Sequence, residues 1–209
     1  MAYGTNCTPN LIESEIVKVF PHFTQGTKEQ DAHQHIDIIN IINGCTVDVK
    51  QPLTFPKTPL TWAINVLTDN GRPGALFGQE NYIALTNLYE VKTSHRICAL
   101  HNTTAFMYLL DRKWLIRKFG IPSYDNCICQ ANNDTDIEIT NNNFGFSESL
   151  GIYFKSCSRK NENSSKLDNK TFFLMINENF FRTYMNELKN SLYFASFKYP
   201  NYKYKVNKN

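Results

Sequence analysis

The chain lacks any run of apolar residues that approaches the roughly 20 needed to span a bilayer as a helix. Its first residues, MAYGTNCTPN, also lack the basic start and apolar core of a secretory leader. We therefore expect a cytoplasmic protein with no membrane partner. The bias toward Asn, Lys, Ile and Tyr favours an AT-rich genome, such as that of a phage or virus.

The six cysteines lack the paired C-x₂-C spacing of a zinc ribbon. Only Cys127 and Cys129 lie close together, and Cys98 lies three residues before His101. This spacing favours free, mostly buried thiols in a reducing compartment over structural zinc or a disulfide framework.

A large charge of either sign is also missing, because 22 basic and 19 acidic residues give a net charge of +3. So mild an excess permits a basic groove for nucleic acid but does not require one. With 209 residues, 42% hydrophobic and 13% aromatic, the chain has the length and composition of one globular domain. We expect a core over about 8–120, a C-terminal elaboration over about 121–197 and a basic tail over 198–209.

The most informative segment is HIDIINIINGCTVDVK, residues 35–50. Apolar residues alternate in it, and Asn43-Gly44 predicts a two-residue hairpin loop. That loop pairs Asp37 with Lys50 and places Asp48 diagonal to Asp37. Residues that oppose each other share a face, so one face is predicted to be core and the other a site. The predicted site face carries Asp37, Ile39, Ile41, Thr46, Asp48 and Lys50.

A solvated hairpin face with an Asp37–Lys50 ion pair is the simpler explanation for these charges. Ile39 and Ile41 argue against it, because they share the charged face and favour burial. Two converging carboxylates can share one Mg²⁺, and a lysine beside them can hold a phosphate. The pattern therefore favours a site for a hard cation.

Asp37, followed after a short turn by Asp48-Val49-Lys50 and preceded by a glutamate-bearing helix, resembles the PD-(D/E)xK nuclease superfamily. Ile36 stands where that family commonly has proline, and Asp31 is an alternative first aspartate, disfavoured because it precedes the strand. The resemblance covers roughly the first half of the chain. It implies an α/β fold with a mixed central β-sheet flanked by helices, a restriction-endonuclease-like core. It also implies hydrolysis of phosphodiester bonds, with DNA as the expected substrate.

The same resemblance implies a role for each motif residue. Asp37, Asp48 and the backbone carbonyl of Val49 would hold Mg²⁺ or Mn²⁺. Lys50 would act on the attacking water or the transition state, and Gln51 would help to place the nucleophile.

The upstream helix is predicted over 9–20, with Thr8 as its N-cap and Pro21 as its stop. Glu15 projects within the apolar stripe of this helix, whereas Glu13 falls toward the margin. A glutamate among apolar residues needs a partner, so we expect Glu15 to hold a water or a second ion. Ordinary first-turn acids are the alternative for both glutamates.

Basic residues further along the chain are candidates for contact with a nucleic-acid backbone. Arg72 lies in a turn, and a helix predicted over 103–119 carries four more: Arg112, Lys113, Arg117 and Lys118. A plain turn arginine and a solvated helix face are the alternatives. The tail alternates lysine with tyrosine, which suits single-stranded nucleic acid or a frayed terminus.

The remaining pattern alternates strands and helices without repeats or linkers. Strands are predicted at 60–68, 81–91, 137–140, 151–155 and 171–176, and a last helix at 178–188. Two other functions stay open: a catalytically inactive nuclease-fold module that binds nucleic acid or a partner protein, and a structural protein with a buried ion network. Assembly as a homodimer also stays open.

Overall fold

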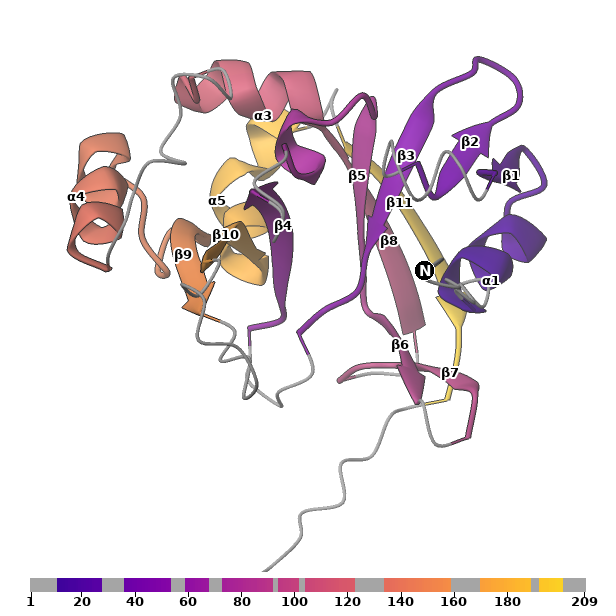
Figure 1. The fold of residues 1–209 in the computed structure, drawn as a ribbon. Coiled ribbons are helices and arrows are strands. Elements are labelled where there is room, and N and C mark those ends of the chain that lie inside the picture. The colour runs from indigo at the N-terminus through magenta and orange to yellow at the C-terminus, as the bar shows by residue number, and fades with distance from the viewer. Residues whose placement is uncertain are drawn as a thin grey trace, which may run out of the picture.

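The computed structural model describes residues 11–27, 36–53, 59–67, 73–91, 94–101, 104–122, 134–158, 170–188 and 192–200. These residues form an α/β fold with a mixed six-stranded sheet, a three-stranded sheet, a two-stranded ribbon and four α-helices (Figure 1). The predicted fold class, α/β with a mixed sheet, is confirmed at this level. None of the helices described is long and apolar enough to cross a membrane.

The elements follow one another in the order α1 (Leu11–Val19), β1 (Phe23–Gln25), β2 (Ile38–Asn40), β3 (Thr46–Lys50), β4 (Thr61–Leu67), the short 3₁₀ helix η1 (Ala75–Phe77), β5 (Tyr82–Thr86), β6 (Leu88–Val91), β7 (Arg96–Ala99), β8 (Thr104–Asp111), α3 (Arg112–Phe119), α4 (Asp134–Phe144), β9 (Ile152–Ser158), β10 (Lys170–Asn177), α5 (Glu178–Leu188) and β11 (Leu192–Lys198).

The six-stranded sheet has the order β1-β2-β3-β5-β8-β11. All neighbouring strands are antiparallel except β3 and β5, which are parallel. A parallel pair needs a crossover connection, and here the crossover contains β4, which belongs to the three-stranded sheet β4-β10-β9. The strand that carries the Asp48-Val49-Lys50 motif is therefore in the middle of the larger sheet.

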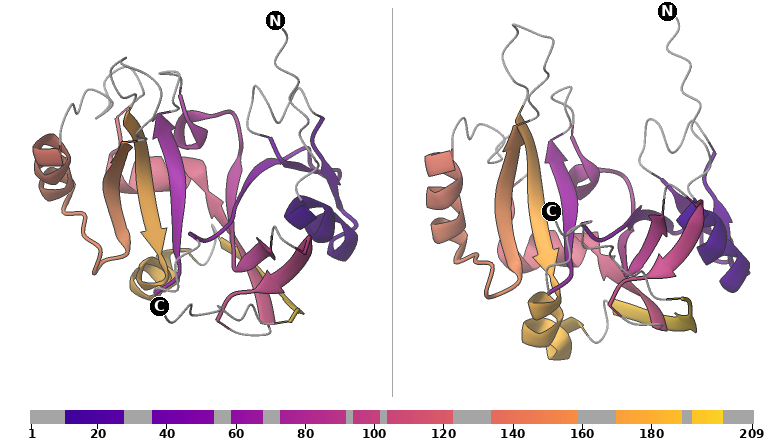
Figure 2. Two further views of the ribbon diagram at one scale, coloured as in Figure 1. Left: turned by 60° about the horizontal axis from the view of Figure 1, so that its bottom comes forward. Right: turned by 90° about the horizontal axis from the view of Figure 1, so that it is seen from below.

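Each face of the larger sheet is covered by a different part of the chain. On one face, α1 packs its Ile12 and Ile16 against Ile38, Val47 and Val49. The opposite face packs against the three-stranded sheet, and Figure 2 shows α1 and α4 on opposite outer sides of the two sheets. Of the predicted apolar face of the 35–50 hairpin, Ile36, Ile38, Val47 and Val49 are confirmed as buried, whereas Ile42 is exposed.

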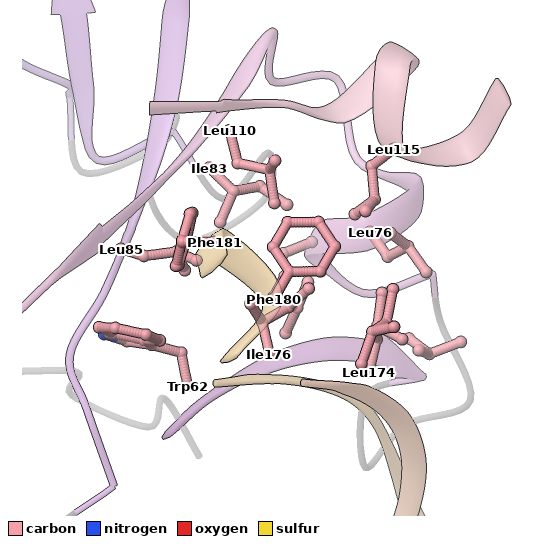
Figure 3. Packing of buried hydrophobic residues seen from close by; sticks show 14 of the residues in the cluster. Trp62, Leu76, Ile83, Leu85, Leu110, Leu115, Leu174, Ile176, Phe180 and Phe181 are labelled. Carbon is pink, nitrogen blue, oxygen red and sulfur yellow. The ribbon is translucent and has the colours of Figure 1, made fainter. Parts of the chain in front are cut away.

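The core between the two sheets is rich in aromatic and branched side chains. α5 places two phenylalanines into it, and Figure 3 shows the Phe180 ring near the centre of the group. The buried residues that surround it include Trp62, Leu76, Ile83, Leu85, Leu110, Leu115, Leu174 and Ile176. Burial of this much apolar surface is the main favourable contribution to folding.

The predicted register of the β2–β3 hairpin is wrong by two residues. Ile38 pairs with Val47 and Ile39 with Thr46, so the loop spans residues 41–44 instead of two residues. Asp37 is therefore not paired with Lys50. A shift of two residues preserves the alternation of faces, so the separation of apolar from charged positions survives the error.

Side chains of the loop itself explain its greater length. The Asn40 side chain accepts a hydrogen bond from the Ile42 N–H at 2.9 Å, and the Asn43 side chain accepts one from the Cys45 N–H at 3.0 Å. These local bonds stabilise a four-residue turn that competes with the tight Asn-Gly loop. Ile41 and Ile42 are 62% and 79% exposed, so the expectation that Ile41 favours burial is also wrong.

The predicted helix over 103–119 is wrong in its first half. Residues 104–111 form β8, and the helix α3 begins only after Asp111, whose side chain accepts a hydrogen bond from the Trp114 N–H at 3.0 Å. β8 lies between β5 and β11 and is buried on both faces, so its apolar run is continuous. Such a run cannot be told from a buried helix by periodicity alone.

The predicted strand at 137–140 is a helix, α4. Asn141 docks this helix on β9, because its side chain donates to the Phe154 carbonyl at 3.0 Å and accepts from the Phe154 N–H at 2.6 Å. That tertiary contact overrides a short alternating pattern.

The other predicted elements are found. α1, β4, β9, β10 and α5 lie within or across the predicted ranges, whereas 81–91 divides into β5 and β6. The predicted N-cap Thr8 and the tail beyond residue 200 lie outside the described residues.

Candidate active site

The candidate site is built on β3. Asp48 and Lys50 lie on the face opposite Val47 and Val49, as strand alternation requires. In the parallel pairing with β5, Asp48 is beside Ile83 and Lys50 beside Leu85. Asp48 is only 2% exposed, so both of its oxygens are removed from bulk water.

Asp37 lies alongside Asp48 through two contacts with β3. Its N–H donates to the Val47 carbonyl at 3.1 Å, and its Oδ2 accepts from the Val49 N–H at 2.5 Å. These contacts lie on either side of Asp48 in sequence. Burial raises the pKa of Asp37 well above its ordinary value, and the charges of Asp48 and Glu13 raise it further, while the Val49 N–H and Lys50 oppose the shift.

Lys50 closes an ion pair with Asp48, because its Nζ lies 2.7 Å from Oδ1. Burial alone lowers the pKa of Lys50, but the charge and hydrogen bond of Asp48, with weaker effects of Asp37 and Glu80, raise the net pKa above the ordinary value. The lysine is therefore a cation at neutral pH. The second Asp48 oxygen, Oδ2, is buried without a hydrogen-bond partner.

The glutamate of α1 whose charge reaches Asp37 is Glu13. Glu13 is 9% exposed, and its charge acts on Asp37. Glu15, the residue expected to contribute, instead pairs with Lys18 at 2.6 Å and accepts a hydrogen bond from the Tyr199 hydroxyl at 2.7 Å. These partners lower the pKa of Glu15, with the Lys18 hydrogen bond the largest cause. The structure therefore does not bring Glu15 to the other site residues.

Glu80 is a member of the cluster that the motif did not indicate. It is 0% exposed, and neither carboxylate oxygen has a hydrogen-bond partner. Burial raises the pKa of Glu80 to about 7, and repulsion from Asp48 adds to this, while its own backbone N–H, Arg112 and Lys50 act in the opposite direction. The sequence signal was an acid directly before a strand and next to a glycine-containing turn.

The surroundings of Glu80 hold its backbone and leave room for its carboxylate. Arg112 donates from Nε to the Glu80 carbonyl at 2.7 Å and from a terminal nitrogen to the Leu76 carbonyl at 3.2 Å. A Cβ on Gly78 would lie 2.1 Å from a Glu80 carboxylate oxygen, so a larger residue there would force the carboxylate to shift.

The other predicted site residues lie apart from this cluster or outside the described residues. Gln51 is half-buried directly after β3, and Arg72 lies outside the described residues. Arg112 is engaged with backbone carbonyls, as above. On the exposed face of α3, Lys118 forms an ion pair with Glu187 and lies over the Tyr184 ring. The two remaining exposed basic residues of α3 are Lys113 and Arg117.

The donor atoms of the cluster suit a hard divalent cation. Mg²⁺ and Mn²⁺ favour carboxylate and carbonyl oxygens, and Mg²⁺ often takes only one or two carboxylates. The partnerless Asp48 Oδ2 is a donor of this kind. Among the described residues, no group of three or more His, Cys, Asp or Glu side chains lies close enough together to hold a metal ion. The fit therefore rests on two aspartates and the Val49 carbonyl.

Comparison with known proteins adds no relative. The chain matches no protein-family model, and the searches of curated proteins and of solved structures also gave no match.

Proposed function

We propose that the chain is a divalent-metal-dependent nuclease that hydrolyses phosphodiester bonds in DNA. The observation that carries this proposal is the burial of two neighbouring aspartates, Asp37 and Asp48, beside a half-buried lysine. Buried carboxylates are costly unless a cation or hydrogen-bond donors compensate them. A bound cation would lower the free-energy cost of burying these two carboxylates side by side, which supports a site for a cation and a phosphate. The restriction-endonuclease-like core is part of this proposal.

In this site Asp37, Asp48 and the Val49 carbonyl hold Mg²⁺ or Mn²⁺. A bound cation of this kind supplies Lewis-acid stabilisation to a phosphate oxygen. Lys50 offsets the negative charge that develops on the phosphate and orients the attacking water. Gln51, the next residue, would help to place that water.

The immediate surroundings position these groups. The Val49 N–H fixes one Asp37 oxygen, and the pairing of β3 with β5 fixes the direction of Asp48 and Lys50. Sites built on paired strands hold their side chains more rigidly than sites on loops. The exposed residues Lys113 and Arg117 on α3 supply positive charge for the DNA backbone.

A second candidate function is a catalytically inactive module that binds nucleic acid or a partner protein. The closed Lys50–Asp48 ion pair favours it, because a lysine can neutralise a buried aspartate without any metal. The two functions differ in one property: the module needs no divalent cation.

The test is cleavage of supercoiled, linear and single-stranded DNA with Mg²⁺ or Mn²⁺. Wild type is compared with Asp48→Ala, Lys50→Ala and the exposed control Glu138→Ala. We expect both site substitutions to lower the cleavage rate by about 1,000-fold or more, and the control to leave it unchanged. The substrate preference then separates internal cleavage from end processing.

A folded wild-type protein that neither cuts DNA nor binds a divalent cation would refute the proposal. Metal-independent binding of DNA by the same protein would establish the inactive module instead.

A further inference from the structure

The loop between β2 and β3 presents two adjacent isoleucines to solvent. Ile41 and Ile42 are 62% and 79% exposed, more than any other large apolar side chain among the described residues. No charged residue interrupts the sequence from Ile38 to Val47. Single exposed apolar residues are ordinary on protein surfaces, whereas neighbouring ones on an uncharged loop indicate an interaction site.

Hydrogen bonds hold the backbone of this loop in one conformation. The Gly44 N–H donates to the Asn40 carbonyl at 2.7 Å, and the Ile41 N–H donates to the His22 carbonyl at 2.8 Å. The side chains of Asn40 and Asn43 bond within the same loop, as described above. The two isoleucines are therefore already in place, so little conformational entropy is lost when they bind a ligand.

The loop lies at the end of the larger sheet where the basic helix α3 begins. Val47 pairs with Tyr82, and Tyr82 pairs with Asp111, so the start of β3 and the end of β8 lie at the same end of the sheet. The exposed Lys113 follows in the first turn of α3. Figure 1 shows the loop and α3 together at the top of the molecule. Two strand spacings separate the base of the hairpin from the start of α3, roughly 10 Å.

An apolar loop near a cation suits DNA, in which stacked bases lie between two rows of phosphates. Isoleucine is one of the side chains that DNA-bending proteins insert between neighbouring base pairs. Gly44 precedes Asp48 by four residues, which is roughly 13 Å along the chain and corresponds to about four base steps. The loop is thus within one helical turn of the phosphate that the proposed function assigns to Asp48.

A second copy of the chain fits this surface less well. A stable protein interface buries roughly 800 Å² on each partner, and two isoleucines cover only a small part of that area. Insertion between two base pairs needs no larger surface than these two side chains.

We propose that Ile41 and Ile42 form a wedge that enters between base pairs of duplex DNA and unstacks them. The substrate class is then duplex DNA that is easily unstacked, such as DNA with a mismatched pair, because unstacking costs less free energy there. This inference rests on the proposed function for its ligand, DNA. It requires neither a bound cation nor cleavage.

The test compares binding of the full chain to two short duplexes, one fully paired and one with a single mismatched pair. Affinity is measured by fluorescence anisotropy in the presence of a chelator. The variants are the double substitution Ile41→Ser/Ile42→Ser and the control Ile139→Ser, whose isoleucine is 52% exposed on α4. We expect wild type and the control to bind the mismatched duplex about tenfold more tightly, and the double variant to bind both duplexes equally.

Unstacking itself is measured with 2-aminopurine, an adenine analogue whose fluorescence rises when it leaves the base stack. With the analogue beside the mismatch, wild type should raise the fluorescence on binding and the double variant should not. This signal distinguishes a wedge from residues that only add affinity.

The contrary outcomes can be told apart. Equal affinity of wild type for the two duplexes, or a preference that the double variant retains, overturns the inference and leaves the proposed function standing. Loss of binding to anionic phospholipid vesicles in the double variant, with its DNA binding unchanged, assigns the loop to a membrane surface instead. Loss of a dimer in sedimentation, again with DNA binding unchanged, assigns it to a second copy. Preference for the mismatched duplex without any metal-dependent cleavage supports the wedge and refutes the nuclease, whereas no DNA binding by folded wild type refutes both.

Discussion

Buried polar groups are hydrogen-bonded at one end of β5 and lack hydrogen-bond partners at the other. At the C-terminal end, Thr86 and Asn87 are fully buried and hydrogen-bonded: the Trp62 indole donates to the Thr86 carbonyl at 2.7 Å, and Asn87 accepts from the Phe106 N–H at 2.8 Å. At the N-terminal end, Glu80 is equally buried but its carboxylate has no hydrogen-bond partner.

Within one strand, the hydrogen-bonded end therefore contributes to stability, and the other end contributes to the candidate site. A satisfied buried network contributes to a unique, stable core, whereas an unsatisfied carboxylate costs free energy. Burial of the apolar side chains around Trp62, in the core drawn in Figure 3, offsets that free-energy cost. Hydrogen bonding is therefore complete where the strand joins the core and incomplete where it reaches the candidate site.

The largest effect is expected at the satisfied end. Asn87→Ala removes the acceptor of the Phe106 N–H and the donor to the Thr104 carbonyl, which lies 3.0 Å away. Phe106 is buried and its N–H loses this acceptor, so we expect the free energy of unfolding to fall by about 2–3 kcal/mol in urea denaturation. The exposed Asn143→Ala is the matched control. A loss no greater than that of the control would show that the hydrogen bonds of Asn87 do not contribute to stability.

An opposite and smaller effect is expected at the unsatisfied end. The raised pKa of Glu80 means that the folded protein binds more protons than the unfolded chain between pH 4.5 and about 7. Stability of the metal-free protein therefore falls as pH rises through this window and stays lower above it. Glu80→Gln removes this dependence.

We therefore expect the stability of Glu80→Gln relative to wild type to be greater at pH 8 than at pH 5, by roughly 2–3 kcal/mol. Urea denaturation in the presence of a chelator, at pH 5 and at pH 8, measures this difference. The control Glu138→Gln should show no such change. An equal difference at both pH values would mean that Glu80 titrates normally.

The smallest effect on stability is expected for a substitution at Gly78, which lies next to the Glu80 carboxylate. An alanine there would crowd the Glu80 carboxylate, so we expect Gly78→Ala to cost about 1 kcal/mol of stability. In a Glu80→Ala background the same change should stabilise by about 0.5 kcal/mol, because alanine restricts the unfolded chain. Additive effects of the two substitutions in thermal unfolding would show that the carboxylate lies elsewhere.

Sequence reasoning found the strand that carries the site because its signal is local. Alternation in β3 separates Val47 and Val49 from Asp48 and Lys50, and this separation does not depend on the register. The register itself failed because Asn40 and Asn43 bond within the loop, and competition among turn types is not visible in a hairpin signal.

The two acidic residues outside the motif, Glu13 and Glu80, were harder to predict for a different reason. Glu13 and Glu15 differ by two positions on one helix, and the choice between them depends on where α1 docks. Glu80 precedes β5 and comes near the motif because β5 pairs with β3, and this pairing joins strands that β4 and η1 separate in the sequence. Both errors come from tertiary contacts.

The strand order of the larger sheet has a consequence for synthesis of the chain. Its strands appear as β1-β2-β3-β5-β8-β11, so they increase in sequence from one edge to the other. During translation each new strand can add at the same edge, next to a partner that has already left the ribosome. Asp37, Asp48, Lys50, Glu80 and Arg112 have all emerged before β9 and β10 of the second sheet are made. The acidic cluster can thus assemble first and acquire its covering sheet afterwards.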